Sequence, residues 1–205
     1  MILPSISKGL LSVNSLLKTS NKPIVRPFWH WLNHVWNEYD PKRVEEVGPN
    51  RACAEWLLKC GAHVKFKNWG SYIVDFNKMP PGSFEAFKIE EIRAENACIM
   101  ARGFEYFNGL KDVKSVKFIN CELIDDTALA KLSYLRSSLE DLQLVFLPSV
   151  TDLGLTYLYL LENLKDLYLN YLPNVKDEKL AEKLLREKLP KCKVEFLQNP
   201  DEIKK

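Results

Sequence analysis

The chain has 205 residues, of which 46% are hydrophobic and 27% are charged, and its formal net charge is +2. This composition is typical of a folded globular protein with one core and an extension. The near balance of charge argues against nucleic acid as a partner, and no apolar run reaches the roughly 18 residues that span a bilayer.

The N-terminal segment breaks the charge balance. Four basic residues and no acidic one precede Glu38, and serines alternate there with leucine, isoleucine and valine. A basic, serine-rich, acid-free amphipathic leader is typical of a mitochondrial transit peptide. We therefore predict a transit peptide over residues 1–25, cleaved between 18 and 26, with a merely disordered N-terminus as the alternative.

A tryptophan-rich helix is predicted next, over Arg26–Asp40. Its apolar residues, including Val35 and Trp36, recur at the spacing of one helical face. Trp29 and Trp31 lie beside that stripe. Such a helix either docks on its own domain or touches a membrane interface or a partner protein, where tryptophan is favoured.

A small α+β module is predicted over residues 26–82. Its second helix is expected to begin at a cap on Asn50 and to end at Gly61, a residue suited to the left-handed C′ position. Alternating residues on both sides of Asn68 predict a β-hairpin. The turn sequence KMPPGS then marks a boundary with the domain predicted over 83–205.

The second domain repeats itself. LEDLQLVFLPSVTD (139–152) and LKDLYLNYLPNVKD (164–177) share eight residues at an offset of 25. The predicted strands of the series contain Ile92-x-Ala94, Val116-x-Phe118, Leu142-x-Leu144, Leu167-x-Leu169 and Val194-x-Phe196.

Helical patterns fill the intervals between these strands. Asp126, Asp152 and Asp177 stand where each helix should be capped. The period and pattern match leucine-rich repeats. The predicted fold class is therefore α/β, with a small N-terminal α+β module followed by a short solenoid of about four to five right-handed β-α units.

No catalytic constellation is evident. The histidines lie outside any recognisable triad, and the sequence contains no nucleotide-binding glycine motif. The cysteines are odd in number without CxxC spacing, which favours reduced, mostly buried thiols over a disulfide framework or zinc module. They are Cys53, Cys60, Cys98, Cys121 and Cys192. We expect no enzyme and no small-molecule substrate.

The sequence resembles the mitochondrial ATP synthase subunit s family, also called coupling factor B. The resemblance runs from about residue 26 to 196, and VGPNRACAEWLLKCGA (47–62) and ACIMARGFEYFNGL (97–110) are its most specific parts. It implies a non-catalytic protein, peripheral on the matrix side of the inner mitochondrial membrane, which binds the ATP synthase membrane sector and supports proton-coupled ATP synthesis by limiting proton leak.

The resemblance also implies a bound Mg²⁺ at the positions of Gly61 and Glu95. Threonine is usual at the second position, so Glu95 departs from the family pattern; main-chain carbonyls and water would suit this hard cation. A pair of cysteines important in some members is reduced here to Cys121, which puts any dithiol function in doubt.

The leading hypothesis is therefore a binding module that docks onto a respiratory complex. Its candidate partner or membrane surface comprises Trp29, Trp31, Trp36, Tyr168 and Tyr171. Relatives in the wider family imply an alternative role in assembling the membrane arm of NADH dehydrogenase. Two alternatives come from other classes: a leucine-rich-repeat substrate receptor of a ubiquitin ligase, and a thiol or hydrolytic enzyme whose site we cannot find.

Overall fold

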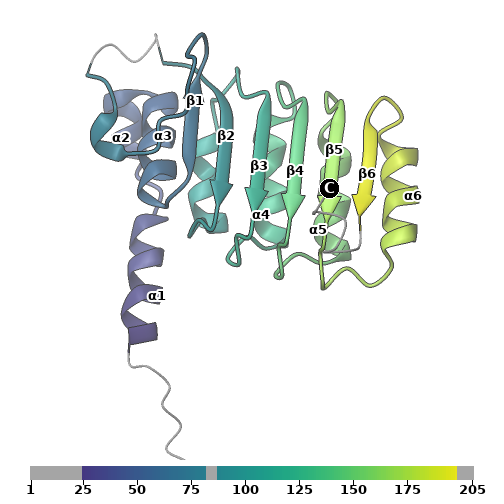
Figure 1. The fold of residues 1–205 in the computed structure, drawn as a ribbon. Coiled ribbons are helices and arrows are strands. Elements are labelled where there is room, and N and C mark those ends of the chain that lie inside the picture. The colour runs from purple at the N-terminus through teal and green to yellow at the C-terminus, as the bar shows by residue number, and fades with distance from the viewer. Residues whose placement is uncertain (1–24, 82–86, 198–205) are drawn as a thin grey trace, which may run out of the picture.

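The computed structural model describes residues 25–81 and 87–197 (Figure 1). The predicted transit peptide lies outside this range except for its last residue, and the predicted boundary after residue 82 also lies outside it. The described chain forms an α/β structure in which one six-stranded sheet carries helices on one of its faces.

Three helices precede the sheet: α1 (Val25–Trp36), α2 (Pro41–Val47) and α3 (Pro49–Lys59). The predicted stop of the second predicted helix, which is α3, is confirmed, because Gly61 follows Cys60 with a φ of +86°. The predicted cap was wrong. Helix α3 begins at Pro49, and the Asn50 side chain instead accepts a hydrogen bond from the backbone N–H of Ile89 at 2.9 Å.

The six strands follow one another across the sheet in chain order, and all neighbouring pairs are parallel except the first. Their bounds are β1 (His63–Phe66), β2 (Ile89–Glu95), β3 (Ser115–Ile119), β4 (Asp141–Val145), β5 (Asp166–Asn170) and β6 (Lys193–Leu197). The predicted hairpin was only half right. Ile73 makes an isolated bridge to Val64, and β1 finds its strand partner in β2.

The five predicted strands of the repeating series are confirmed as β2 to β6. Their pairing register aligns equivalent residues without a shift, so that Val116 faces Leu142 and Leu142 faces Leu167. These side chains point into the helix-covered face and are almost completely buried. Their alternation with polar neighbours is the period-two pattern of a half-buried strand.

The connections between parallel strands are short and partly 3-10 helical. They comprise η4 (Ala101–Phe107), α4 (Asp126–Lys131) with η5 (Leu132–Leu135), α5 (Asp152–Tyr157) with η6 (Leu158–Leu160), and α6 (Glu178–Lys188).

Two of the predicted caps are displaced by one residue. Asp125 and Thr151 cap α4 and α5, and only Asp177 caps as predicted. Asp126 reaches the next unit, where it accepts from the backbone N–H of Thr151 at 2.8 Å and from its hydroxyl at 2.6 Å. Asp152 accepts likewise from the Lys176 N–H. The second polar residue of each turn therefore ties neighbouring units together.

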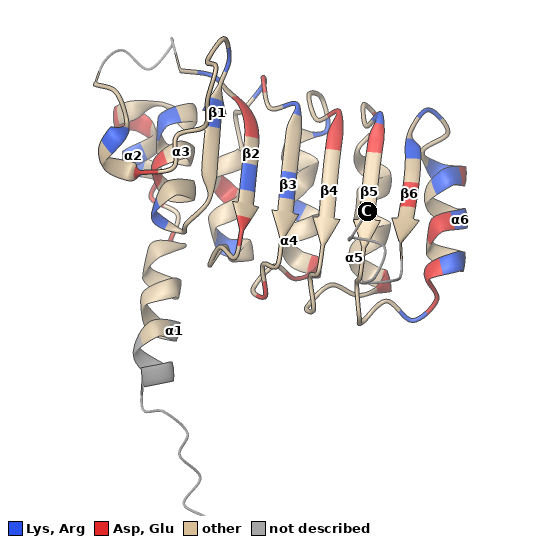
Figure 2. Ribbon diagram, viewed as in Figure 1, with Lys and Arg blue, Asp and Glu red and all other residues tan. Residues whose placement is uncertain are grey.

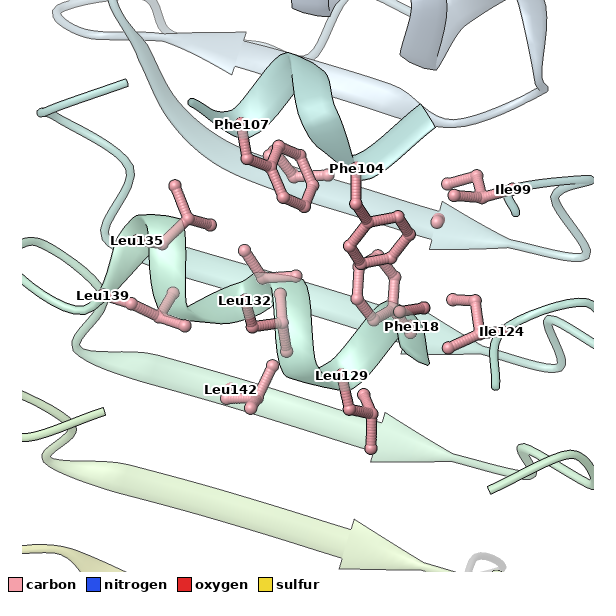
Figure 3. Close-up of a cluster of buried hydrophobic side chains, with 14 of the residues drawn as sticks. Ile99, Phe104, Phe107, Phe118, Ile124, Leu129, Leu132, Leu135, Leu139 and Leu142 are labelled. Carbon is pink, nitrogen blue, oxygen red and sulfur yellow. The ribbon is translucent and has the colours of Figure 1, made fainter. Parts of the chain in front are cut away.

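The core runs continuously from α3 to β6, and Figure 3 shows the part of it where Phe104, Phe107 and Phe118 meet the leucines of α4 and η5. Trp56 of α3 stacks on Tyr106 with ring centroids 5.5 Å apart. Gly103 allows this approach, because a Cβ there would lie 2.3 Å from the indole ring. The N-terminal helices thus share one core with the sheet.

Candidate interaction surfaces

The sheet has an open face, which no described helix covers (Figure 1). Side chains that alternate with the buried rows point to it. The row nearest the strand starts is Glu91, Ser115, Asp141, Asp166 and Lys193, and the next row is Arg93, Lys117, Gln143, Tyr168 and Glu195. Figure 2 shows acidic residues at the starts of β4 and β5. A polar, uncovered sheet face of this kind can bind a protein segment, since it offers many fixed hydrogen-bonding groups.

The carboxyl edge of the sheet has an unusual backbone. The residue after each of β2, β3, β4 and β5 is left-handed, with φ between 49° and 55°. Its N–H continues the ladder; that of Phe146, for example, donates to the Asn170 carbonyl at 3.0 Å. Asparagine tolerates this conformation and fills the first two positions, whereas aromatic residues rarely adopt it. The last two positions nevertheless hold Phe146 and Tyr171.

Phe146 and Tyr171 form a stacked pair on this edge. Their ring centroids are 5.2 Å apart with an interplanar angle of 9°, and Tyr171 is 39% exposed. The neighbouring units avoid backbone strain because they place asparagine at this position. Strained backbone conformations are often found where a side chain serves a function. The pair is a flat aromatic surface at the end of two adjacent strands.

Helix α1 carries a second aromatic surface. Trp29 and Trp31 are more than half exposed, and Trp36 is 37% exposed. Val35 and Trp36, which belong to the predicted apolar stripe, are 43% and 37% exposed, so this part of the stripe is not buried in the protein's own core. In Figure 1 the helix extends beyond the body of the protein at the β1 end of the sheet.

A single buried amide fixes the base of α1. Asn37 is fully buried, and its Nδ2 donates to the carbonyls of Asn33 and Cys98 at 2.9 and 2.7 Å. Its Oδ1 accepts from the Trp56 indole at 3.1 Å and from the Met100 N–H at 2.8 Å. Every hydrogen-bonding site of this amide is filled, so it locks α1 to α3 and to the loop after β2.

The five residues predicted as a surface do not form one patch. The three tryptophans lie on α1, whereas Tyr168 and Tyr171 belong to β5 and the residue after it, near the other end of the sheet (Figure 1). Tyr168 is half-buried on the open face and accepts a hydrogen bond from Asn170 at 2.9 Å. Sequence periodicity could identify exposed aromatics but not the distance between them.

Gly61 and Glu95, the two predicted metal positions, lie on neighbouring segments. His63 pairs with Arg93 in the antiparallel register of β1 and β2. Before this register the backbone follows another course, because the Cys98 N–H donates to the Cys60 carbonyl at 2.9 Å and a Cβ on Gly61 would lie 4.0 Å from the Ala97 Cα. Main-chain oxygens near Gly61 and Glu95 are the groups that would hold a hard cation. The Glu95 carboxylate is engaged by Arg93 at 2.8 Å. Among the described residues, no group of three or more His, Cys, Asp or Glu side chains could hold a metal ion.

Three of the five thiols are buried rather than activated. Cys53, Cys60 and Cys121 are buried as predicted. Burial raises the pKa of Cys60 to about 12 and that of Cys53 well above its ordinary value. A nucleophilic cysteine requires a lowered pKa, since the thiolate is the reactive form. These two thiols are protonated at neutral pH and suit packing better than catalysis.

Comparison with known proteins identifies the family. No family model matches the chain. The rat protein (Rattus norvegicus) named "ATP synthase subunit s, mitochondrial" is 38% identical over 161 residues, which cover 77% of this chain and 79% of the relative. This chain belongs to the mitochondrial ATP synthase subunit s family.

Other relatives extend this relationship. The bovine subunit s (Bos taurus) is 35% identical over 162 residues, covering 78% of this chain and 80% of the relative. A fruit-fly protein (Drosophila melanogaster) named "Distal membrane arm assembly component 2" is 26% identical over 117 residues, covering 53% of this chain and 41% of the relative. The described helices of this subunit s family member include none with the length and apolarity needed to cross a bilayer.

Three residues that the structure singles out escaped sequence reasoning: Asn37, Asp141 and Asp166. An isolated asparagine in a helical pattern gives no signal of a long-range hydrogen-bond network. The two aspartates do have a signal, because each precedes the Leu-x-Leu of its strand at the same position. That repetition predicts adjacent carboxylates once parallel pairing is assumed.

Proposed function

We propose that this chain is a non-catalytic mitochondrial protein that binds the membrane sector of ATP synthase and supports coupled ATP synthesis by limiting proton leak. The similarity to proteins named as ATP synthase subunit s, along more than three quarters of the chain, carries the proposal. The open sheet face and the exposed aromatic residues support it, because a docking protein requires such surfaces.

The repeating part is, in this proposal, a short leucine-rich-repeat solenoid. Strands β2 to β6 recur at intervals of 24 to 27 residues with equivalent residues in register. Each unit buries its apolar side chains against the next, which is how such repeats are stabilised. The solenoid would present its open face to the partner.

Peripheral attachment to the matrix side of the inner membrane is assigned to α1. Trp29 and Trp31 are exposed on a helix that extends from the body, and tryptophan is favoured at the boundary between headgroups and acyl chains.

A bound Mg²⁺ at the main-chain oxygens of Gly61 and Glu95 would stabilise the base of this region. Isothermal titration with Mg²⁺ tests that site, and no heat of binding would contradict it.

The function is tested with the full chain carrying an affinity tag in mitochondria. We expect ATP synthase subunits in the eluate after mild detergent extraction, and a higher proton leak when the protein is depleted. Recovery of no ATP synthase subunit, together with unchanged proton leak, would contradict the proposal. Cytosolic location of the full chain would instead favour a ubiquitin-ligase receptor.

A second candidate function is assembly of the membrane arm of NADH dehydrogenase. The similarity to the fruit-fly distal membrane arm assembly component favours it, although the match is weaker and covers less of the chain. This role predicts co-purification with NADH dehydrogenase subunits during assembly. Loss of the protein would then reduce the mature dehydrogenase while leaving the amount and coupling of ATP synthase unchanged.

A further inference from the structure

The open face contains a shallow depression over β4, β5 and β6. Its polar lining, which we call the acidic depression, consists of Asp141, Gln143, Asp166, Tyr168, Lys193 and Glu195. Asp141 and Asp166 are direct register partners on neighbouring parallel strands. Like charges that face each other across adjacent strands destabilise a sheet. The protein therefore keeps an unfavourable pair of carboxylates at the starts of β4 and β5, where Figure 2 shows acidic positions in red.

The described residues that line the depression supply little to neutralise this pair. Lys193 is the register partner of Asp166, but its ammonium group lies 2.5 Å from a carboxylate oxygen of Glu195. The partner of Asp141 is a neutral hydroxyl, since Ser115 donates to its Oδ2 at 2.7 Å. Three carboxylates of the depression thus share one lysine. An additional cation would relieve the repulsion.

A second observation on the same face also points to a ligand. Asn170 is fully buried, and its Nδ2 donates to the hydroxyl of Tyr168, which lines the depression. Within the described part of the chain, its Oδ1 accepts no hydrogen bond. A buried carbonyl oxygen without a donor is costly and uncommon in proteins. The missing donor would come from outside the described chain.

We infer that the acidic depression binds an extended segment of a protein partner that carries a lysine or arginine side chain between Asp141 and Asp166. Charge complementarity selects the cation, and the Tyr168 hydroxyl, which accepts from Asn170, lines the same depression. The described residues contain no three-ligand set for a metal, which favours an organic cation. The inference rests on the proposed function in that the partner is a respiratory-complex subunit.

The test uses the full chain and a fluorescein-labelled peptide of alternating threonine and lysine, with a threonine–glutamine peptide as its neutral match. We expect the lysine peptide to bind in low salt and the neutral peptide to bind much more weakly. The double variant Asp141→Asn/Asp166→Asn should lose about tenfold or more in affinity, as expected for a lost charged hydrogen bond.

A charge-matched control is Glu162→Gln/Glu187→Gln, which removes two exposed carboxylates outside the depression. This control should bind the lysine peptide like the unaltered chain, and both double variants should keep the same circular dichroism spectrum. Equal binding by the Asp141→Asn/Asp166→Asn variant would overturn the inference, as would an equal loss in the control.

The chain's own C-terminal lysines are the competing occupant. If Lys204→Gln/Lys205→Gln strengthens peptide binding severalfold, the tail fills the depression and the inference of a partner segment fails.

Binding to purified ATP synthase separates this inference from the proposed function. If the unaltered chain and Asp141→Asn/Asp166→Asn bind it equally, the inference fails and the proposed function stands. Loss of binding by that variant alone supports both. Peptide binding without binding to any respiratory complex refutes the proposed function and, with it, the identity of the partner, but leaves the acidic depression as a site for a cationic segment.

Discussion

The substitution Asn37→Asp tests whether one buried amide holds α1 in place. The aspartate would keep the oxygen that accepts from Trp56 and Met100. Its second oxygen would replace the Nδ2 donor and face the carbonyls of Asn33 and Cys98, which now lie 2.9 and 2.7 Å from that nitrogen. The change is nearly isosteric, so its cost is electrostatic.

At each of these two contacts a buried acceptor would face another acceptor, which lowers the free energy of unfolding by about 1–3 kcal/mol per contact. The carboxylate also loses hydration in a fully buried position. We therefore expect the free energy of unfolding at pH 7 to fall by about 3–5 kcal/mol. Burial raises the folded-state pKa of the new carboxyl above its unfolded value, so the folded state binds the proton more tightly. The loss must then shrink as the pH falls from 7 to 5.

Urea unfolding followed by circular dichroism, with amide hydrogen exchange over residues 25–36, measures both effects. The control is Asn163→Asp, which alters an exposed amide that also donates to a carbonyl, that of Ser137 at 2.8 Å. We expect the control to cost less than about 1 kcal/mol. A loss below about 1 kcal/mol for Asn37→Asp, or one independent of pH, would refute the reasoning.

Three further substitutions probe the core, the charge network and the aromatic edge. Gly103→Ala should cost about 1–3 kcal/mol of unfolding free energy in urea, because its Cβ meets an indole ring at 2.3 Å; Gly70→Ala, with open space around it, should be neutral. Burial would raise the pKa of Glu55, but its two arginine partners outweigh that effect and lower it. The ion pairs of Glu55 therefore stabilise the fold at pH values above the unfolded-state pKa. Glu55→Gln should lower the free energy of unfolding by about 2 kcal/mol at pH 7, and by progressively less as the pH falls below 4.5. A loss that does not depend on pH would contradict this. Phe146→Asn should change unfolding free energy by less than about 1 kcal/mol, because relief of left-handed strain offsets the lost stacking on Tyr171; a larger loss in urea would show that the pair is mainly structural.

The sheet was predictable because its signal is local and repeated. Leu142-x-Leu144 and Leu167-x-Leu169 recur with the same neighbours, and each repetition adds independent support for a strand. Parallel pairing in register then follows from equal spacing. The end of α3 was predictable for a similar reason, since a left-handed residue after a helix favours glycine strongly.

Errors arose where two adjacent residues could serve one role. Asp125 and Asp126 can both cap a helix, as can Thr151 and Asp152, and local propensity does not choose between them. The choice comes from the neighbouring unit, because the second residue bonds to the turn that follows the next strand of the sheet. The hairpin error also comes from a contact that is distant in the sequence. Strand β1 pairs with β2, which follows it by more than 20 residues, and local turn signals do not reveal that pairing.

The candidate interaction surfaces were hardest to predict because they depend on departures from the repeat. Four equivalent positions after the strands share one left-handed backbone conformation, and asparagine satisfies it at the first two with little strain. Phe146 and Tyr171 satisfy the same geometry at a cost, yet they stack on each other at the surface. Asp141 and Asp166 likewise accept repulsion that a neutral pair would avoid. Both departures fall on the same two strands, β4 and β5. The strain and the unbalanced charge are therefore confined to one part of an otherwise regular sheet, which is where we place the contact with a partner.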